Sequence, residues 1–222
     1  MIFHSAVKFL GCSMPPYSDE DITVEPMLFN CDYSAARRKG GPITNKFLDL
    51  LPDSWKETPL VVDTRVHMLM PGWYPAIPGW HLDDVPRTRG DHQPNFDDPL
   101  RSEHCVALVN GWLAPTEFAC GNLDFSIPEK GSHIKVYESV NEQLNKLDKT
   151  KYNLVSARND KLVIFNDRCW HRAVPATGRG WRWFGRVSRY SRYDEQCERP
   201  NKRTNALRKQ TQIYLPAVEA GW

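Results

Sequence analysis

The most constraining feature of the sequence is a regular alternation at residues 58–70. Apolar or small side chains occupy one set of alternate positions and polar ones the other: Val62, Thr64, Val66, Met68 and Met70 against Asp63, Arg65 and His67. Because successive side chains of a β-strand point to opposite faces, this pattern predicts a strand with one face in the core. Arg65 and His67 are then candidates for the lining of a barrel interior.

Short strand signals dominate the rest of the chain. They lie at residues 104–112, 116–120, 123–127, 152–156, 161–165 and 181–190. The segments 152–156 and 161–165 are predicted to form a hairpin through residues 158–160. Helical spacing marks residues 136–147, and residues 206–215 are a further helix candidate. Many short strands with few helices predict a mainly β fold with flanking helices, either an antiparallel barrel or a sandwich.

The N-terminal part is expected to hold smaller elements. Residues 21–29 alternate enough to predict a strand, and residues 35–42 are typical of a polar connection. Residues 44–51 predict a short amphipathic helix that ends at Pro52.

The length of 222 residues predicts a single domain, 1–222, and 41% apolar residues are too many for a disordered chain. Within this domain we expect three parts: a catalytic β-barrel core at about 58–192, a strand and helix extension at 1–57, and a polar C-terminal tail at 193–222.

Charge and cysteine content exclude some classes of protein. The formal net charge is only +2, which gives no general field for a nucleic acid or a membrane. Basic residues gather between positions 179 and 209, where a solvated face competes with a contact to an anionic substrate. The six cysteines form no CxxC pair, so neither a zinc knuckle nor a disulfide framework is indicated. With no signal-peptide pattern and no apolar run of about 20 residues, we expect a cytoplasmic protein with reduced thiols.

Candidate metal ligands stand out in the segment 78–84, where His81 and Asp83 lie two positions apart. On an extended backbone such residues share a face, so they can offer one nitrogen and one oxygen to the same metal ion. His171, ninety positions further on, is the best candidate for a third ligand. Two histidines and one carboxylate suit non-haem Fe(II) and leave coordination positions open.

The order His81-Leu82-Asp83, His171 and a downstream arginine resembles the Fe(II)/2-oxoglutarate-dependent oxygenase superfamily, over residues 61–188. The resemblance implies a double-stranded β-helix, a jelly-roll or cupin-like barrel, in which His81, Asp83 and His171 hold Fe(II). It implies a dioxygenase that uses O2 to convert 2-oxoglutarate to succinate while it hydroxylates a C–H bond. Desaturation or cyclisation stays open as the outcome, whereas the carboxylate at Asp83 disfavours a halogenase.

The resemblance also implies an anion-binding arginine on the strand after the distal histidine, which grips the far carboxylate of 2-oxoglutarate. In several branches this arginine belongs to an Arg-x-Ser pair, and Arg186 with Ser188 reproduces the pair fifteen positions after His171. Arg182, at eleven positions, is a rival, because other branches use the shorter spacing. Strand alternation puts Arg182, Arg186 and Ser188 on one face. A guanidinium fork suits a carboxylate better than a lysine would.

The 85–102 loop is long and proline-punctuated, which is typical of a functional loop. We expect it to cover the primary substrate, a small or medium-sized or anionic molecule, with Arg87 or Arg89 available to an anionic group.

Asp167 is a candidate hydrogen-bond partner of His171, or a turn-forming residue. Candidates for the near carboxylate of 2-oxoglutarate are Asn110, Thr116 and His104.

Other interpretations stay open at this point. His81 and Asp83 have an alternative as surface loop residues, and His171 as a hydrogen-bonded core histidine. Cupin-type isomerases and thiol dioxygenases typically use a His-x-His pair, which the sequence lacks. A zinc hydrolase with the same ligands, a non-enzymatic binding module and an oxygenase acting on nucleic-acid bases remain. The last predicts salt-dependent binding to DNA or RNA. The oligomeric state is not indicated.

Overall fold

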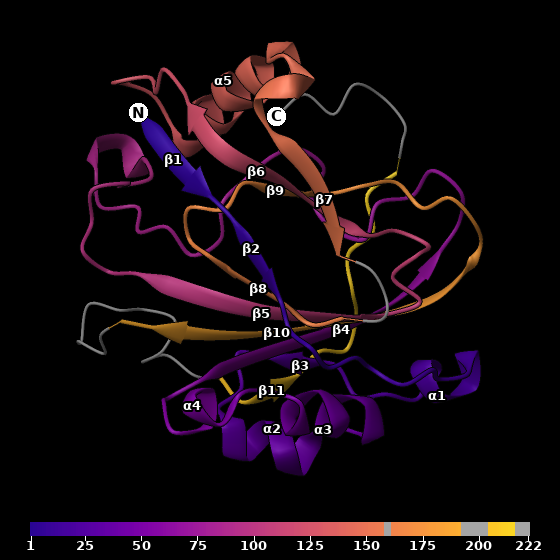
Figure 1. Ribbon diagram of the computed structural model, residues 1–222. Coiled ribbons are helices and arrows are strands. Elements are labelled where there is room, and N and C mark those ends of the chain that lie inside the picture. The colour runs from indigo at the N-terminus through magenta and orange to yellow at the C-terminus, as the bar shows by residue number, and fades with distance from the viewer. Residues whose placement is uncertain (158–160, 192–203, 216–222) are drawn as a thin grey trace.

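The protein is built from two antiparallel sheets that face each other, with helices on the outer sides (Figure 1). The structure is a computed structural model and describes residues 1–157, 161–191 and 204–215. The mainly β fold with flanking helices is therefore confirmed. The pairings of the described strands give two main sheets and no closed barrel, so the double-stranded β-helix stays a prediction.

The larger sheet has the strand order β2-β8-β5-β10-β4. Its strands are β2 (Val7–Phe9), β8 (Val163–Asn166), β5 (Ser102–Val109), β10 (Gly180–Tyr190) and β4 (Val61–Leu69). The smaller sheet has the order β1-β6-β7, with β9 also paired to β6. Its strands are β1 (Ile2–Ser5), β6 (Thr116–Asp124), β7 (Asn153–Ala157) and β9 (His171–Ala173).

The predicted alternation of β4 is confirmed, and it decides what each face of the larger sheet carries. Val62 and Val66 pack in the outer core, whereas Asp63, Arg65 and His67 line an internal cavity. In the register with β10, Asp63 stands opposite Arg186 and His67 opposite Arg182. The polar faces of β4 and β10 therefore lie side by side and point inward.

Helices cover the outer face of the larger sheet: α1 (Asp19–Thr23), α2 (Tyr33–Lys39), α3 (Pro42–Asp49) and α4 (Asp53–Lys56). The predicted helix at 44–51 is confirmed and begins two residues earlier, with Pro42 in its first turn. The buried carboxylate of Glu25 accepts hydrogen bonds from three backbone amides at the start of this helix, which lack partners within the helix. Phe47 then packs edge-on against Trp183, with ring centroids 5.8 Å apart.

The smaller sheet is covered by α5 (His133–Lys146), which confirms the helix predicted at 136–147. Val136, Val140 and Leu144 form the buried stripe of this helix and join Trp170 and other residues of the sheet in a second core. Residues of both sheets meet in a third core, which includes Val106, Phe118 and Phe165.

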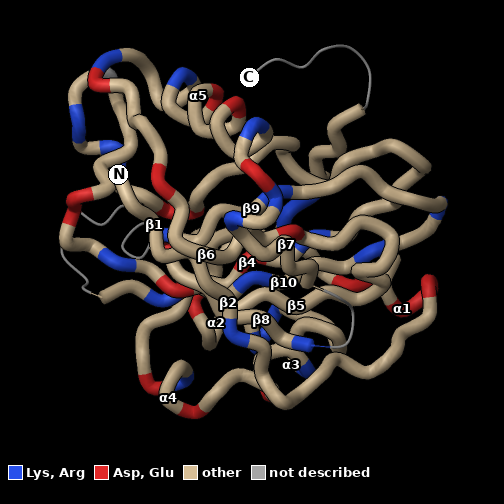
Figure 2. Tube along the Cα trace, turned by 45° about the horizontal axis from the view of Figure 1, so that its top comes forward, with Lys and Arg blue, Asp and Glu red and all other residues tan. Residues whose placement is uncertain are grey.

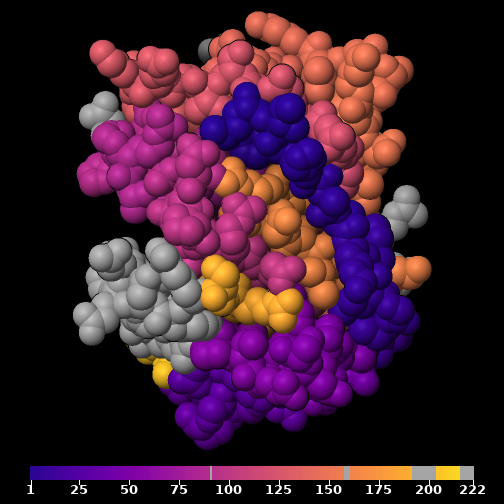
Figure 3. Space-filling model, turned by 60° about the vertical axis from the view of Figure 1, so that its left-hand side comes forward, coloured from indigo at the N-terminus to yellow at the C-terminus, as the bar shows by residue number. Residues whose placement is uncertain are grey.

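The N-terminal strands tie the two sheets together. β1 pairs with β6 in the smaller sheet, and β2 pairs with β8 in the larger one. Figure 3 shows this indigo segment running down one side of the molecule from one layer to the other. The sheets therefore include strands that lie outside the expected core of residues 58–192, whose boundaries stay a prediction.

Two N-terminal expectations are wrong. Residues 21–29 were expected to form a strand, but Ser18 caps α1 through a reciprocal capping box with Asp21, and only β3 (Leu28–Phe29) is extended. Residues 35–42 were expected to be a connection, but Asp32 caps α2, whose last turn carries three basic residues. In both places a short capping side chain outweighs the local pattern.

Three further expectations are also wrong. The strands predicted at 116–120 and 123–127 are one strand, β6. The predicted hairpin is absent because β7 pairs with β6 in one sheet and β8 with β2 and β5 in the other; residues 158–160 lie outside the described residues. Residues 206–215 are not helical, since β11 (Ala206–Leu207) pairs with β3. Tertiary pairing here overrides local propensity. Most of the predicted tail at 193–222 is not described.

Two short 3-10 helices complete the described chain: η1 (Gly90–His92), inside the otherwise irregular 85–102 loop, and η2 (Lys149–Lys151). Within the described ranges, no helix is both long enough and apolar enough to cross a membrane.

Candidate metal centre

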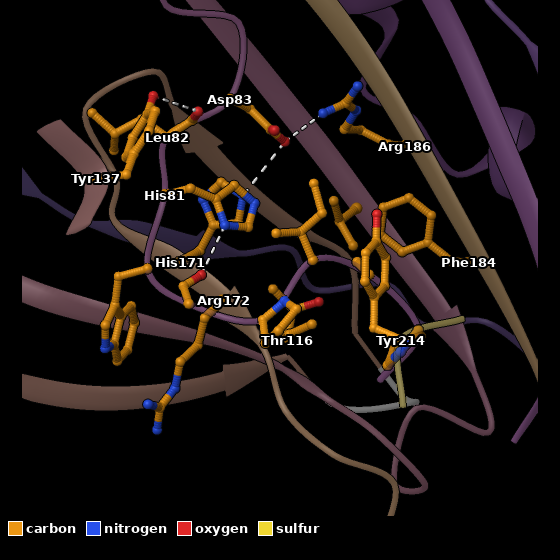
Figure 4. Close-up of a pocket in the computed structure, with 18 of the residues that line it drawn as sticks. His81, Leu82, Asp83, Thr116, Tyr137, His171, Arg172, Phe184, Arg186 and Tyr214 are labelled. Atoms are coloured by element: carbon orange, nitrogen blue, oxygen red, sulfur yellow. Dashed lines mark hydrogen bonds and ion pairs between the residues drawn. The ribbon is translucent and has the colours of Figure 1, made fainter. Parts of the chain in front are cut away.

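His81, Asp83 and His171 form a group that is able to hold a metal ion. One ligand atom from each residue lies within 4.8 Å of the others. Figure 4 shows the two imidazole rings and the Asp83 carboxylate turned toward one another, with Arg186 on the far side of Asp83. The three candidates drawn from sequence spacing are therefore brought together.

The two histidines are held by pairing of their own backbones. The His81 amide donates to the His171 carbonyl at 2.9 Å, and the His171 amide donates to the His81 carbonyl at 3.1 Å. β9 in turn pairs with β6, where Phe118 stands opposite His171. The position of both imidazoles is thus set by the smaller sheet.

Asn141 on α5 fixes the segment that carries His81, and sequence analysis missed this residue. Its side chain accepts a hydrogen bond from the Trp80 amide at 2.7 Å and donates one to the Trp80 carbonyl at 2.9 Å. Gly79, next to it, has φ +98°, and a Cβ there would approach the Asn141 Oδ1 to 3.2 Å. A side chain at position 79 is therefore disfavoured both by backbone conformation and by space.

Both imidazoles present the same nitrogen to the centre. Nδ1 of His81 lies 2.9 Å from the Gly79 carbonyl oxygen, and Nδ1 of His171 lies 3.0 Å from the Cys169 carbonyl oxygen. A carbonyl only accepts, so Nδ1 of each ring carries a proton and Nε2 is the atom turned toward the centre. Burial, and then the neighbouring His171, lower the pKa of His81 to about 4, which keeps this ring neutral near pH 7.

The Asp83 carboxylate is held between the histidines and a buried arginine. Its Oδ2 lies 3.4 Å from Nε2 of His171 and accepts a hydrogen bond from Nη1 of Arg186. Burial opposes ionisation of Asp83, but Arg186 and His171 outweigh it and hold the pKa of Asp83 well below its usual range. Nη2 of Arg186 also lies 3.6 Å from Oδ2 of Asp63 on β4. Arg186 therefore bridges two carboxylates.

The centre opens into a cavity of about 460 Å³ between the sheets. Charges of both signs lie in the middle of the molecule, where β4 and β10 run side by side (Figure 2). Arg182 is 2% exposed, and among the described residues no carboxylate forms an ion pair with it. Burial, and then the neighbouring Arg65, lower the pKa of Arg182 to about 9. Arg65 lines the same cavity, which thus contains two neighbouring guanidinium groups.

The alternation predicted for β10 is present, but the side chains on its inward face have different surroundings. Arg182 and Arg186 line the cavity, whereas Ser188 is fully buried behind them. Its hydroxyl lies 2.8 Å from Nδ1 of His104, whose Nε2 lies 3.2 Å from the Ser102 hydroxyl. Burial lowers the pKa of His104 to about 4.

Some of the remaining residues suggested by the sequence line the cavity, and the others lie outside it. Thr116 and Arg87 line the cavity, and Arg89 does not. Asn110 donates to the Trp181 carbonyl at 3.0 Å, at the end of β5. Asp167 forms an ion pair with Arg101 at 3.2 Å rather than a hydrogen bond to His171.

Two cavity residues come from a segment whose role sequence analysis missed. Gln212 and Tyr214 line the cavity, and Tyr214 forms a β-bridge with Tyr74. Ile213, between them, packs against the same small core as Trp73, which consists of Leu69, Ala114 and Ala176. The only local signal for this role is the apolar and aromatic pair Ile213 and Tyr214 in a polar stretch, which does not identify a cavity wall.

Comparisons with known proteins do not assign the chain to a family. No family profile matches the sequence, and no curated protein matches it. Two solved structures resemble parts of the fold. EvdMO1 is 11% identical with a TM-score of 0.33, and the match spans 62% of this chain and 27% of the EvdMO1 chain. EvdO2 from Micromonospora carbonacea var. aurantiaca, complexed with 2-oxoglutarate, is 14% identical with a TM-score of 0.34. The match spans 70% of this chain and 61% of the EvdO2 chain. At these TM-scores we base the functional conclusion on the geometry of the site alone.

Proposed function

We propose that the protein is a non-haem Fe(II)- and 2-oxoglutarate-dependent oxygenase that hydroxylates a C–H bond of a small or medium-sized substrate. One observation carries the proposal: His81, Asp83 and His171 converge beside a cavity that also contains a buried guanidinium, Arg182, with no ion pair to any described carboxylate. The two facing antiparallel sheets are compatible with the double-stranded β-helix of such oxygenases.

The donor set fits Fe(II). His81 and His171 would offer one imidazole nitrogen each and Asp83 one carboxylate oxygen, a set that would leave coordination positions of the ion open to the 2-oxo acid and O2. The protons on Nδ1 of His81 and His171 are held by backbone carbonyls, so neither ring needs to change tautomer when a metal binds. When iron and 2-oxoglutarate are bound together, they supply the oxidising chemistry.

The cavity offers Arg182 as the partner of the far carboxylate of 2-oxoglutarate. An unpaired buried guanidinium gains a strong, charge-assisted pair when a carboxylate enters. Arg65 is the neighbouring guanidinium and adds to the attraction.

Arg186, with the Ser188 hydroxyl, is the other candidate for this role. However, it already bridges Asp83 and Asp63, and Ser188 is turned to His104. We therefore assign the role to Arg182.

The substrate side of the cavity combines aromatic walls with polar groups. Tyr137 donates from its hydroxyl to the Leu82 carbonyl at 3.4 Å, and burial raises its pKa to about 12, so its hydroxyl remains protonated. Tyr214 forms part of the opposite wall, as Figure 4 shows. Arg87, in the 85–102 loop, is available to an anionic group of the substrate. These side chains position the substrate and exclude water from the centre.

Anaerobic absorbance spectroscopy tests the proposal. The metal-free protein is titrated with Fe(II) and then with 2-oxoglutarate. A weak visible charge-transfer band that needs both additions is expected, because it reports chelation of the 2-oxo acid by protein-bound iron. Iron binding without this band would favour a different mononuclear metalloenzyme, and no iron binding would remove the proposal.

A further inference from the structure

Arg186, next to the candidate metal centre, has a carboxylate beside each of its two terminal nitrogens. Nη1 of Arg186 donates to Oδ2 of Asp83, and Nη2 lies 3.6 Å from Oδ2 of Asp63. The Arg186 side chain is 12% exposed and the Asp63 side chain 5%. We propose that Arg186 is a positioning residue for the metal: together with Asp63 it forms a clamp that holds the Asp83 carboxylate in the orientation for coordination.

The far end of the clamp is itself fixed. Oδ1 of Asp63 accepts a hydrogen bond from the Asn30 amide at 3.0 Å and from Nη2 of Arg208 at 3.3 Å. Arg208 stacks on Phe29, with 4.2 Å between the guanidinium carbon and the ring centroid, and Nε donates to the Leu28 carbonyl at 3.3 Å. Asp63 is therefore a rigid anchor, connected to the N-terminal segment and to residues 204–215.

Charge balance explains why the arginine does not repel the metal. A single guanidinium beside a ligand would oppose the approach of a divalent cation. Asp63 offsets part of the positive charge of Arg186, although it also pairs with Arg208, so Arg186 brings hydrogen-bond direction to Asp83 at a reduced electrostatic cost to the metal. Groups that hydrogen-bond to a metal ligand typically contribute about 10- to 100-fold to metal affinity. The clamp is expected to act within this range.

Arg182 provides a matched comparison on the same strand. It lies on the same face of β10, four residues before Arg186, and also lines the cavity as a buried side chain. It has no ion pair with either Asp83 or Asp63. If burial of positive charge near the centre were sufficient, both arginines would affect metal affinity equally.

The test measures the affinity of the full chain for Co(II), by its visible absorption and by calorimetry, without 2-oxoglutarate. Arg186→Gln and Asp63→Asn are expected to raise the dissociation constant of Co(II) by about 10- to 100-fold. Arg186→Lys is expected to recover part of the loss, since an ammonium group can reach Asp83 but cannot bridge two carboxylates as a fork. Arg182→Gln should not raise the dissociation constant, because this variant removes a buried positive charge and no ion pair to Asp83 or Asp63. If Arg186→Gln does not fold by circular dichroism, Arg186→Lys, which keeps a buried cation, decides the question.

The inference rests on the metal site of the proposed function, but not on its co-substrate. Wild-type protein that binds Co(II) but no 2-oxoglutarate would contradict the proposed oxygenase and leave the clamp intact. Equal Co(II) affinity in wild-type protein, Arg186→Lys and Asp63→Asn would overturn the clamp. If that result came with weakened 2-oxoglutarate binding in Arg186→Lys, Arg186 would take the role of anion-binding arginine.

Discussion

His81 and His171 exchange both of their backbone hydrogen bonds, although ninety residues separate them in the chain. This pairing brings their ring centroids to 4.5 Å and turns both Nε2 atoms to the same side as Asp83. A β-bridge of this kind is rigid, because strand β9 is also paired to β6. The spacing of the two nitrogen ligands is therefore a property of the sheet, and it does not depend on the 85–102 loop.

Replacement of either histidine should remove the metal. His81→Ala and His171→Ala each delete one of three protein ligands, so we expect Fe(II) or Co(II) binding to weaken by more than about 100-fold, beyond the effect typical of an outer hydrogen-bond partner. Metal content after gel filtration, measured by atomic absorption, checks this. His4→Ala is the control, because His4 is exposed, contacts Asn122 and is not part of the group of candidate ligands. Equal metal content in all four proteins would mean that the three side chains meet without a metal-binding role.

Removal of Arg182 should weaken 2-oxoglutarate binding and at the same time stabilise the ligand-free protein. Arg182→Gln deletes a charge-assisted pair with the co-substrate, worth about 10- to 100-fold in affinity. It also deletes a buried charge that pairs with no carboxylate of the described residues, so the midpoint of thermal unfolding without ligand should rise. Calorimetric titration of the metal-loaded protein and thermal unfolding measure the two effects.

Arg189→Gln is the control for this experiment. Arg189 lies on the same strand but outside the cavity, where it forms an ion pair with Glu103. This variant should bind 2-oxoglutarate like the wild type. A loss of affinity in Arg189→Gln but not in Arg182→Gln would contradict the assignment.

The inward faces of β4 and β10 were predictable from local patterns, whereas β9, the short strand that begins at His171, was not predicted. His81 and Asp83 are two residues apart, and the alternation of β4 and β10 identifies which side chains share a face. These relationships depend only on the period of a β-strand. The bridge between Arg186 and Asp63 was not predictable, because it requires the register of β10 against β4, which neither strand specifies alone.

Most of the site residues that the sequence did not indicate contact partners far away in the chain. Asn141 holds the backbone at Trp80 from a helix 61 positions away, and only the folded arrangement brings the two together. The same is true of Tyr214, which reaches the cavity through its bridge to Tyr74. In the N-terminal part the reason is different. Single capping contacts, such as Asp32 at α2, decided between helix and loop where the apolar pattern was weak.

Stability of the metal-free protein should fall between pH 7 and pH 5. The pKa of His104 is about 4 in the folded protein, because the ring is buried, and near 6.5 in the unfolded chain. Between these values the unfolded state binds more protons, so the free energy of unfolding decreases as the pH falls. The difference amounts to about 2 kcal/mol at pH 5.

Urea unfolding with a chelator present, at pH 7 and pH 5, measures this loss. His81 contributes in the same direction, since its pKa is also about 4. In His104→Gln the decrease should be smaller by about 2 kcal/mol, because one buried neutral histidine is gone. An unchanged decrease in this variant would mean that His104 does not carry the pH dependence.

Gly185 should be the position on β10 that least tolerates a side chain. A Cβ there would overlap Cη2 of Trp183 and lie 2.9 Å from Cδ1 of Phe47, and these two rings pack against each other. We expect Gly185→Ala to lower the free energy of unfolding by about 1–3 kcal/mol, the usual cost of overpacking a core. Gly11→Ala is the control, since a Cβ at Gly11 meets no atom within 4 Å. Chemical denaturation compares the two.

A second substitution separates overpacking at Gly185 from a backbone effect. Phe47→Leu alone should destabilise the protein, because it removes part of a buried ring. Combined with Gly185→Ala, the smaller side chain at position 47 gives the Trp183 ring space to shift away from the new methyl group, so the double variant should be more stable than the sum of the two single changes predicts. Strict additivity would indicate that the cost of Gly185→Ala arises from the strand backbone. In that case Phe184 and Arg186, the neighbours of Gly185 that line the cavity, would be expected to shift with it.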